Sequence, residues 1–228
     1  MKERVLIIVA HPDDETLGCG GYISKFKKNK NFRIVFICEG TSCRYSENYK
    51  RSEIDKEISK RNKDSVKAMH FLGVKNFKFY NLPCGRLDKI DILNINKIIE
   101  FEINQFKPMT IITHSSEDCN NDHRIVFRSV SMATRPSPQN TFIKEILSCE
   151  ILSSTEWNFD KVFEPNYFIE LKKKDLENKI KSMNFYKSEI QKGNMPRTKD
   201  GLITLAKFRG KIINKQYAEV FRILRKIS

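Results

Sequence analysis

The sequence lacks several features that mark secreted and membrane-spanning chains. None of its 6 cysteines forms a Cys-x-x-Cys pair, the spacing that many structural zinc sites and redox centres use. Its first apolar run, residues 5–10, is too short and too soon followed by charge to be a signal peptide or a membrane span. We therefore expect free, buried thiols in a reducing compartment, and a cytoplasmic protein with no transmembrane segment.

Acidic residues are in the minority, because 28 Asp and Glu stand against 42 Lys and Arg, which gives a formal net charge of +14. The basic residues are spread along the whole chain, as on a solvated, lysine-rich surface. The charge also favours an acidic partner, such as a phosphorylated small molecule, an anionic lipid or a nucleic acid. No nucleic-acid-binding motif accompanies it, so we expect no nucleic-acid partner.

Apolar runs alternate with charged, amphipathic stretches along the first part of the chain. Runs rich in β-branched and aromatic residues predict strands at 5–10, 32–38, 76–82 and 109–114. Helices are predicted between and after them, at 15–30, 51–72, 91–106 and 122–134. This order predicts an α/β, Rossmann-like fold with a mostly parallel sheet flanked by helices.

The regular alternation of predicted strands and helices ends after residue 140. Strand-like segments are predicted at 142–152 and 166–172, an amphipathic helix at 173–190, and further regular structure at 202–226. The apolar face of this helix is expected to contain Leu176, Ile180, Met183 and Tyr186. No low-complexity linker or internal repeat interrupts the chain, so we expect one domain, residues 1–228, with a C-terminal extension.

In the stretch VLIIVAHPDDETLGCGG, residues 5–21, polar and charged side chains directly follow the first predicted strand. A turn with a helix cap would explain a lone His-Pro-Asp. Here His11 and Pro12 are followed by two adjacent carboxylates, Asp13 and Asp14, which repel each other unless a cation or a hydrogen-bond donor relieves them. A divalent metal would supply that relief, and His with Asp is a sensible partial ligand set for zinc.

Two further histidines lie where they can complete such a site. The chain has 4 histidines, of which His70 falls within the predicted helix 51–72 and is expected on a helix face or in the core. His114 and His123 lie in THSSEDCNNDHR, directly after the fourth predicted strand. Because segments that follow parallel strands meet at one edge of a sheet, they can approach His11. Asp122, beside His123, is expected to orient a ligand imidazole.

The stretch VAHPDDETLGCGG resembles the signature of the LmbE-like, or PIG-L, family of zinc-dependent N-deacetylases. This family includes the N-acetylglucosaminyl-phosphatidylinositol, mycothiol-pathway and bacillithiol-pathway deacetylases. Later segments resemble further parts of the family pattern in the expected order: RNKDSVKAMHFLGV, NNDHR, EPNYFIEL and LAKFRGKIINKQYAEVFRIL. The resemblance is thus distributed over most of the chain, and its first motif is the most specific.

The resemblance implies three ligands for Zn²⁺, or for another divalent metal such as Fe²⁺, namely His11, Asp14 and His123. It implies Asp13 as the general base that takes a proton from metal-activated water. The expected reaction releases acetate from an N-acetylamino sugar conjugate: a sugar nucleotide, a glycoside or a glycolipid precursor. The net charge favours a conjugate that carries phosphate. The alternatives are a different acyl amide and, less favoured, a basic nucleic-acid-binding module.

One position departs from the pattern of many relatives, in which a histidine that assists the transition state stands where this chain has Asn120. An amide donates hydrogen bonds but cannot be a cationic acid, so either Asn120 acts in a reduced role or His114 assists catalysis. The resemblance suggests Arg61 for substrate binding, and Arg44 lies at the same predicted edge. Asp88 is a candidate for binding sugar hydroxyls. Relatives are often oligomeric, so a homo-oligomer is one expected arrangement.

Overall fold

The computed structural model describes residues 2–46 and 49–228, and within them seven strands form one sheet in the order β3-β2-β1-β4-β5-β7-β6. The first five strands in the chain run parallel, whereas β7 is antiparallel to both β5 and β6. The predicted α/β, Rossmann-like fold is confirmed. The strands are β1 (Glu3–Val9), β2 (Lys30–Cys38), β3 (Asn76–Leu82), β4 (Thr110–Thr113), β5 (Glu145–Cys149), β6 (Tyr167–Glu170) and β7 (Ala218–Lys226).

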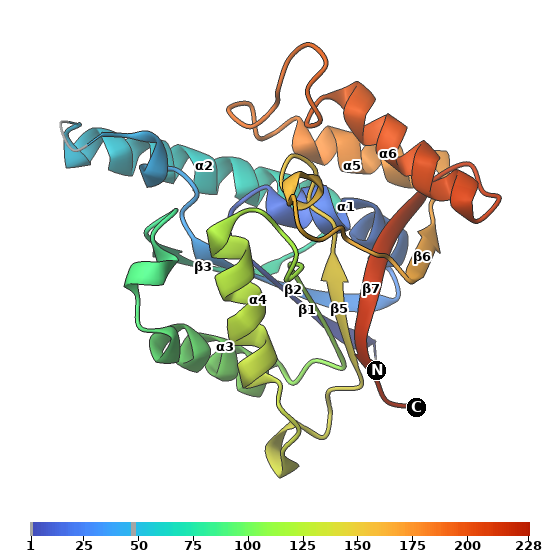
Figure 1. Cartoon of the computed structure of the whole chain (residues 1–228), viewed down its shortest axis with the longest axis horizontal. Helices are drawn as coiled ribbons and strands as arrows, with labels where there is room; N and C mark the ends of the chain where they lie inside the picture. The colour runs from blue at the N-terminus through green and yellow to red at the C-terminus, as the bar shows by residue number, and fades with distance from the viewer. Residues whose placement is uncertain (1, 47–48) are drawn as a thin grey trace.

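Helices cover both faces of the sheet (Figure 1). Those packed on one face are α1 (Asp14–Phe26), α2 (Arg51–Leu72), α5 (Lys173–Met183) and α6 (Lys199–Ile212). Those packed on the other face are α3 (Ile92–Phe106) and α4 (Asn121–Ala133). No helix of the described residues is both long and apolar enough to cross a membrane. The cytoplasmic location and the homo-oligomer stay predictions.

The central strand β1 explains why the first apolar run has no polar interruption. Val5, Ile7 and Val9 pack into the core beneath α1, α2 and α5. Leu6 and Ile8 belong to the other core, beneath α3 and α4. All of these side chains are fully buried. A strand covered by helices on both faces requires apolar residues at every position, which is the pattern of a parallel α/β sheet.

Two predicted helices end earlier than expected, and each has a structural reason. The helix predicted at 15–30 ends at Phe26, because β2 already begins at Lys30. The helix predicted at 173–190 ends at Met183, and the chain turns there so that Tyr186 is buried against α1. The regular structure predicted at 202–226 is present as α6 and β7, which are separated by a turn that contains Asn214 with a positive φ of 54°.

Helix α1 lies unusually close to its neighbours. A Cβ atom added at Gly21 would lie 2.5 Å from Leu171 Cδ1, and one added at Gly18 would lie 2.7 Å from Cys149 Sγ. The Lys179 ammonium of α5 donates to the Leu17 carbonyl at 2.6 Å. The absence of side chains on one face of α1 therefore allows this close approach, which holds the N-terminus of the helix against the carboxyl edge of the sheet.

We expect the substitution Gly21→Ala to lower the free energy of unfolding by about 1–3 kcal/mol, because the new methyl group overpacks the contact with Leu171. In an open helix interior the same change raises stability by roughly 1 kcal/mol, so the sign of the effect is diagnostic. Urea unfolding followed by circular dichroism measures it. Ser52→Ala, on the exposed surface of α2, is the control and should stay within about 0.5 kcal/mol of the parent. A stabilised Gly21→Ala variant would contradict the close packing.

Candidate active site

The carboxyl ends of β1 and β4 bring the predicted site segments together. The two strands are parallel neighbours in the sheet. His11 lies two residues after the end of β1, His114 directly follows β4, and His123 lies in the first turn of α4. Because parallel strands end at the same edge, segments separated by more than 100 residues in the sequence meet there. All three histidines are buried.

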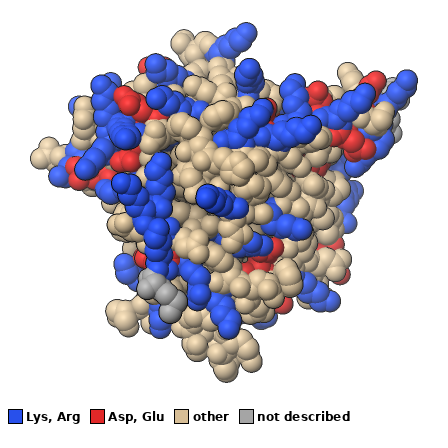
Figure 2. All heavy atoms as spheres, turned by 180° about the vertical axis from the view of Figure 1, so that it is seen from behind, with Lys and Arg blue, Asp and Glu red and all other residues tan. Residues whose placement is uncertain are grey.

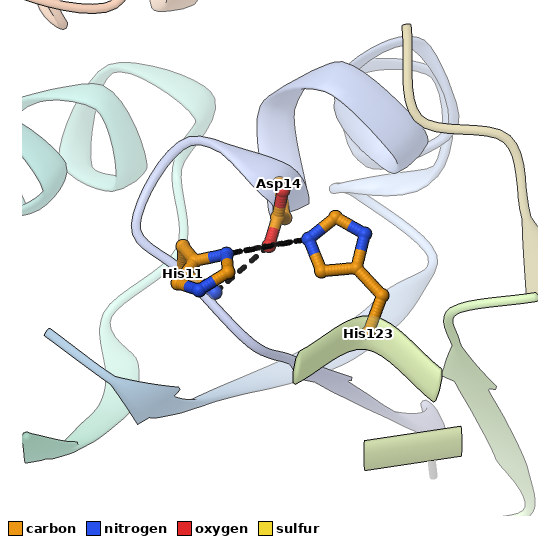
Figure 3. Close-up of side chains that lie close together, drawn as sticks. All are labelled: His11, Asp14 and His123. Atoms are coloured by element: carbon orange, nitrogen blue, oxygen red, sulfur yellow. Dashed lines mark hydrogen bonds and ion pairs between the residues drawn. The ribbon is translucent and has the colours of Figure 1, made fainter. Parts of the chain in front are cut away.

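His11, Asp14 and His123 point toward a common centre (Figure 3). His11 Nδ1 and His123 Nε2 are 3.2 Å apart, and Asp14 Oδ2 lies 3.4 Å from the first and 3.3 Å from the second. A tetrahedral zinc ion with bonds of ~2.0–2.1 Å places neighbouring donors ~3.3 Å apart. The spacing, the burial and the chemistry of this donor triangle therefore fit a divalent cation.

Each imidazole of the triangle is held from behind by a carboxylate. His11 Nε2 lies 3.0 Å from Asp122 Oδ2, and His123 Nδ1 lies 3.0 Å from Asp118 Oδ2. Such partners fix the ring orientation and leave the other nitrogen for a metal. The residue expected to orient an imidazole, Asp122, thus contacts His11. Asp118 was not predicted, and its only signal was a second carboxylate in the loop that precedes His123.

The electrostatics of the triangle favour positive charge at its centre. Burial by itself would lower the pKa of His123, but the Asp14 and Asp118 carboxylates outweigh it and raise that pKa to about 9. The pKa of His11 is also raised well above its usual range, because hydrogen bonds with Asp122 and Asp14 outweigh burial. Burial would raise the pKa of Asp14, yet the neighbouring imidazoles hold it well below its usual range. A cation at the centre would take over the role of these imidazolium charges.

Asp13 is adjacent to Asp14 in sequence but has different partners. Its Oδ1 accepts from Arg61 Nη2 at 3.1 Å, and its Oδ2 accepts from Arg197 Nη1 at 3.2 Å. The backbone at Asp13 has a φ of 121°, a conformation that non-glycine residues rarely adopt and that surrounding structure must enforce. Burial raises the pKa of Asp13 to about 6, although Arg61 opposes the effect. Asp13 therefore lines the cavity without joining the donor triangle.

A buried carboxylate, Glu189, connects the arginines around Asp13. Arg44 donates two hydrogen bonds to it, at 2.9 and 2.7 Å, and Arg61 Nη1 donates another at 2.9 Å. Arg61 also donates to the Pro12 carbonyl, so this buried guanidinium is occupied by acceptors of the protein. The candidates Arg61 and Arg44 both reach the cavity. Glu189 and Arg197 were not predicted, because nothing in the sequence places the segment after α5 next to residue 13.

The remaining candidates differ in position. Asn120 lines the cavity, and its side-chain oxygen accepts from the Asp122 N–H, so the amide retains N–H donors for a ligand. His114 is fully buried, is not among the described residues that line the cavity, and stacks on His123 at 3.8 Å. Its Nε2 accepts from the Ala10 N–H at 2.7 Å, and burial together with His123 lowers its pKa to about 3.

Asp88 is exposed and is not among the described residues that line the active-site cavity, so its expected contact with substrate is not supported.

The cavity above the triangle has a volume of about 150 Å³. Beyond the groups already described, its wall contains Leu152 and two thiols, Cys43 and Cys84, whose sulfurs lie 3.1 Å apart. Cys84 is buried as expected, whereas Cys43 and Cys119 are exposed, so the expectation of buried thiols is wrong for these two. The arrangement can hold a cation, place a carboxylate beside it and offer amide N–H donors, which are groups that metal-assisted hydrolysis of an amide can use.

Comparison with known proteins gives one family. The model of the GlcNAc-PI de-N-acetylase family, PIG-L, matches residues 6–134, a range that contains all three residues of the donor triangle. None of the curated proteins matches the sequence.

Several solved structures have the same fold. The N,N'-diacetylchitobiose deacetylase from Pyrococcus horikoshii is 21% identical, with a TM-score of 0.74 over 98% of this chain and 84% of that one. A zinc-inhibited form of the teicoplanin deacetylase Orf2 is 15% identical, with a TM-score of 0.74 over 98% of both chains. GalB, a 4-carboxy-2-hydroxymuconate hydratase from Pseudomonas putida, is 15% identical, with a TM-score of 0.76 over 99% and 98%. At such identities the likeness shows the fold alone.

We expect His123→Ala to abolish stoichiometric binding of a divalent cation, because the substitution removes one of three donors that face a common centre. Elemental analysis after dialysis against Zn²⁺ should fall from about one ion per chain to near zero. His70→Ala is the matched control, since His70 is exposed on α2 and should leave the metal content unchanged. Full occupancy in His123→Ala would remove this residue from the ligand set.

Proposed function

Because this chain belongs to the GlcNAc-PI de-N-acetylase (PIG-L) family, we propose that it is a metal-dependent hydrolase that removes the acetyl group from an N-acetylamino sugar conjugate. The observation that carries the proposal is the pairing of two adjacent carboxylates with different partners. Asp14 faces the two imidazoles, while Asp13 lines the same cavity and is held by arginines.

His11, Asp14 and His123 would hold the cation, which we propose to be Zn²⁺, with Fe²⁺ as the alternative. When bound, such a cation supplies Lewis-acid chemistry, because it acidifies water and polarises a carbonyl group. Asp122 and Asp118 keep the two imidazoles turned toward it. The teicoplanin deacetylase was solved in a zinc-inhibited form, so assays of this chain should titrate both metals.

Asp13 is proposed as the general base. It accepts a proton from the water whose oxygen attacks the acetamide carbonyl carbon, and it returns that proton to the sugar nitrogen as the C–N bond breaks. The products are acetate and the free amine. Arg61 and Arg197, each bonded to one carboxylate oxygen, keep Asp13 oriented while it changes its protonation state. We assign Arg61 this positioning role instead of direct contact with the substrate.

Asn120 is proposed to donate a hydrogen bond to the oxyanion that forms when water adds to the carbonyl. The bond from the Asp122 N–H occupies its amide oxygen, and this supports the orientation of its NH₂ group as a donor. His114 is proposed to support the ring of His123 by stacking on its face. Its Nε2 already accepts from the Ala10 N–H, so this nitrogen is not assigned a contact with the substrate. The alternative of a different acyl amide is tested by identifying the released acid by mass.

We expect Asp13→Asn to lower the rate of acetate release by roughly 10²- to 10⁴-fold, because the amide cannot accept the proton. Metal content should be retained, since Asp13 is outside the donor triangle. The matched control is Asp88→Asn, the same chemical change at an exposed carboxylate away from the cavity, which should keep near-parental turnover. The assay follows acetate release from N-acetylglucosamine conjugates by metal-loaded protein. A fully active Asp13→Asn variant would show that another group serves as the base.

A further inference from the structure

A second cavity of about 460 Å³ lies next to the active-site cavity. We call it the outer groove. The segment before α6, the first turns of α6 and the loop after β5 form its walls, and Figure 1 shows the first of these, in orange and red, arching over the upper part of the molecule. The lining residues used below are Leu152, Glu156, Met195, Asp200, Leu205 and Phe208.

The outer groove and the active-site cavity share their walls. Leu152 lines both of them. In the loop after β5, Ser153 and Ser154 face the active-site cavity, while Glu156 lines the groove. In the segment before α6, Arg197 reaches Asp13, while its neighbours Pro196 and Thr198 line the groove. A molecule whose acetamide lies above the donor triangle can therefore extend past Leu152 into the groove.

The chemistry of the groove differs from that of the chain as a whole. Although the net charge is +14, no lysine or arginine is among the described residues that line it, whereas Glu150, Glu156 and Asp200 are. Arg209, which is outside this lining, pairs with Glu150, so the negative charge offered to a ligand comes from Glu156 and Asp200. Met195 and Phe208 expose 43% and 55% of their surface, so they offer an apolar floor to a ligand. Carboxylates accept hydrogen bonds from hydroxyl groups and repel phosphate, whereas an aromatic ring packs against the C–H face of a sugar.

The described lining of the active-site cavity contains three arginines, Arg44, Arg61 and Arg197, and each is paired with Asp13 or Glu189. Other basic residues lie farther away. Figure 2 shows Lys and Arg scattered over the face opposite the view of Figure 1, with Asp and Glu among them. A basic cavity of about 470 Å³ does exist, but it lies at the amino ends of β1, β2 and β3, at the opposite edge of the sheet from the donor triangle. Its cationic lining residues are Lys2, Arg4, Lys27, Lys30 and Lys75. The net charge therefore does not indicate a phosphate beside the active site.

We propose that the outer groove binds the group to which the N-acetylamino sugar is attached, and that this group is an uncharged second sugar. The proposal rests on the proposed deacetylase function and names its substrate class: an uncharged oligosaccharide or glycoside, in place of the phosphate-bearing conjugate that the charge suggested. Phe208 and Met195 pack against the second sugar, and Asp200 accepts hydrogen bonds from its hydroxyl groups.

Calorimetric binding to metal-loaded Asp13→Asn protein tests the proposal without turnover. The ligands are N-acetylglucosamine, an uncharged disaccharide of two N-acetylglucosamine units, and UDP-N-acetylglucosamine. We expect the disaccharide to bind at least about tenfold more tightly than the monosaccharide, and the nucleotide sugar to show no such gain. Adding Phe208→Ala should remove most of the disaccharide's advantage. The control Phe101→Ala, at an equally exposed ring on α3, should preserve it. The ratio of KM values for the two sugars on the active enzyme gives a second measurement of the same effect.

Two results would overturn the proposal: tighter binding of the nucleotide sugar than of the disaccharide, or an unchanged disaccharide-to-monosaccharide ratio in the Phe208→Ala protein. Failure of the deacetylase function has a different signature. In that case no acetate is released by the parent enzyme from any of the three ligands, while binding in the groove persists.

Discussion

The repulsion between two buried neighbouring carboxylates, Asp13 and Asp14, is the constraint around which the site is organised. Both are almost completely excluded from solvent, so each requires positive charge close by. Asp14 receives it from His11 and His123, and Asp13 receives it from Arg61. The positive φ at Asp13 turns the backbone between the two and directs them to separate partners. This separation leaves one carboxylate able to hold a cation and the other able to carry a proton.

The range matched by the family model and the part of the chain after it contribute different residues to the site. The range matched by the family model, residues 6–134, contains the donor triangle and the carboxylates behind it. The later part contributes Arg197, which donates to Asp13, and Glu189, which accepts from Arg61. It also contributes Tyr186, whose hydroxyl donates to Glu15 at 2.6 Å. All the described residues that line the outer groove also belong to this later part. The residues proposed to carry out the reaction therefore lie mostly in the matched range, and the groove proposed to select the substrate lies outside it.

The features that could be predicted from the sequence depend on local patterns or on the geometry of parallel sheets. The uninterrupted apolar run of β1 indicated a strand buried on both faces, and strand ends at a common edge brought His11 and His123 together. Contacts between distant segments could not be read in this way. The predicted helix 173–190 stops at Met183 because the chain turns to bury Tyr186, a tertiary effect that outweighs local periodicity. Glu189 carried no motif, since its role depends on arginines from two other segments.

Anomalous diffraction from crystals grown with Zn²⁺, recorded at the zinc absorption edge, is the most direct test of the central claim. The account predicts one strong peak inside the donor triangle, ~2.0–2.2 Å from His11 Nδ1, Asp14 Oδ2 and His123 Nε2, with the Asp13 carboxylate beyond bonding distance. A zinc ion bound through Asp13 with Asp14 unbound, or the absence of any peak between the two imidazoles, would contradict it.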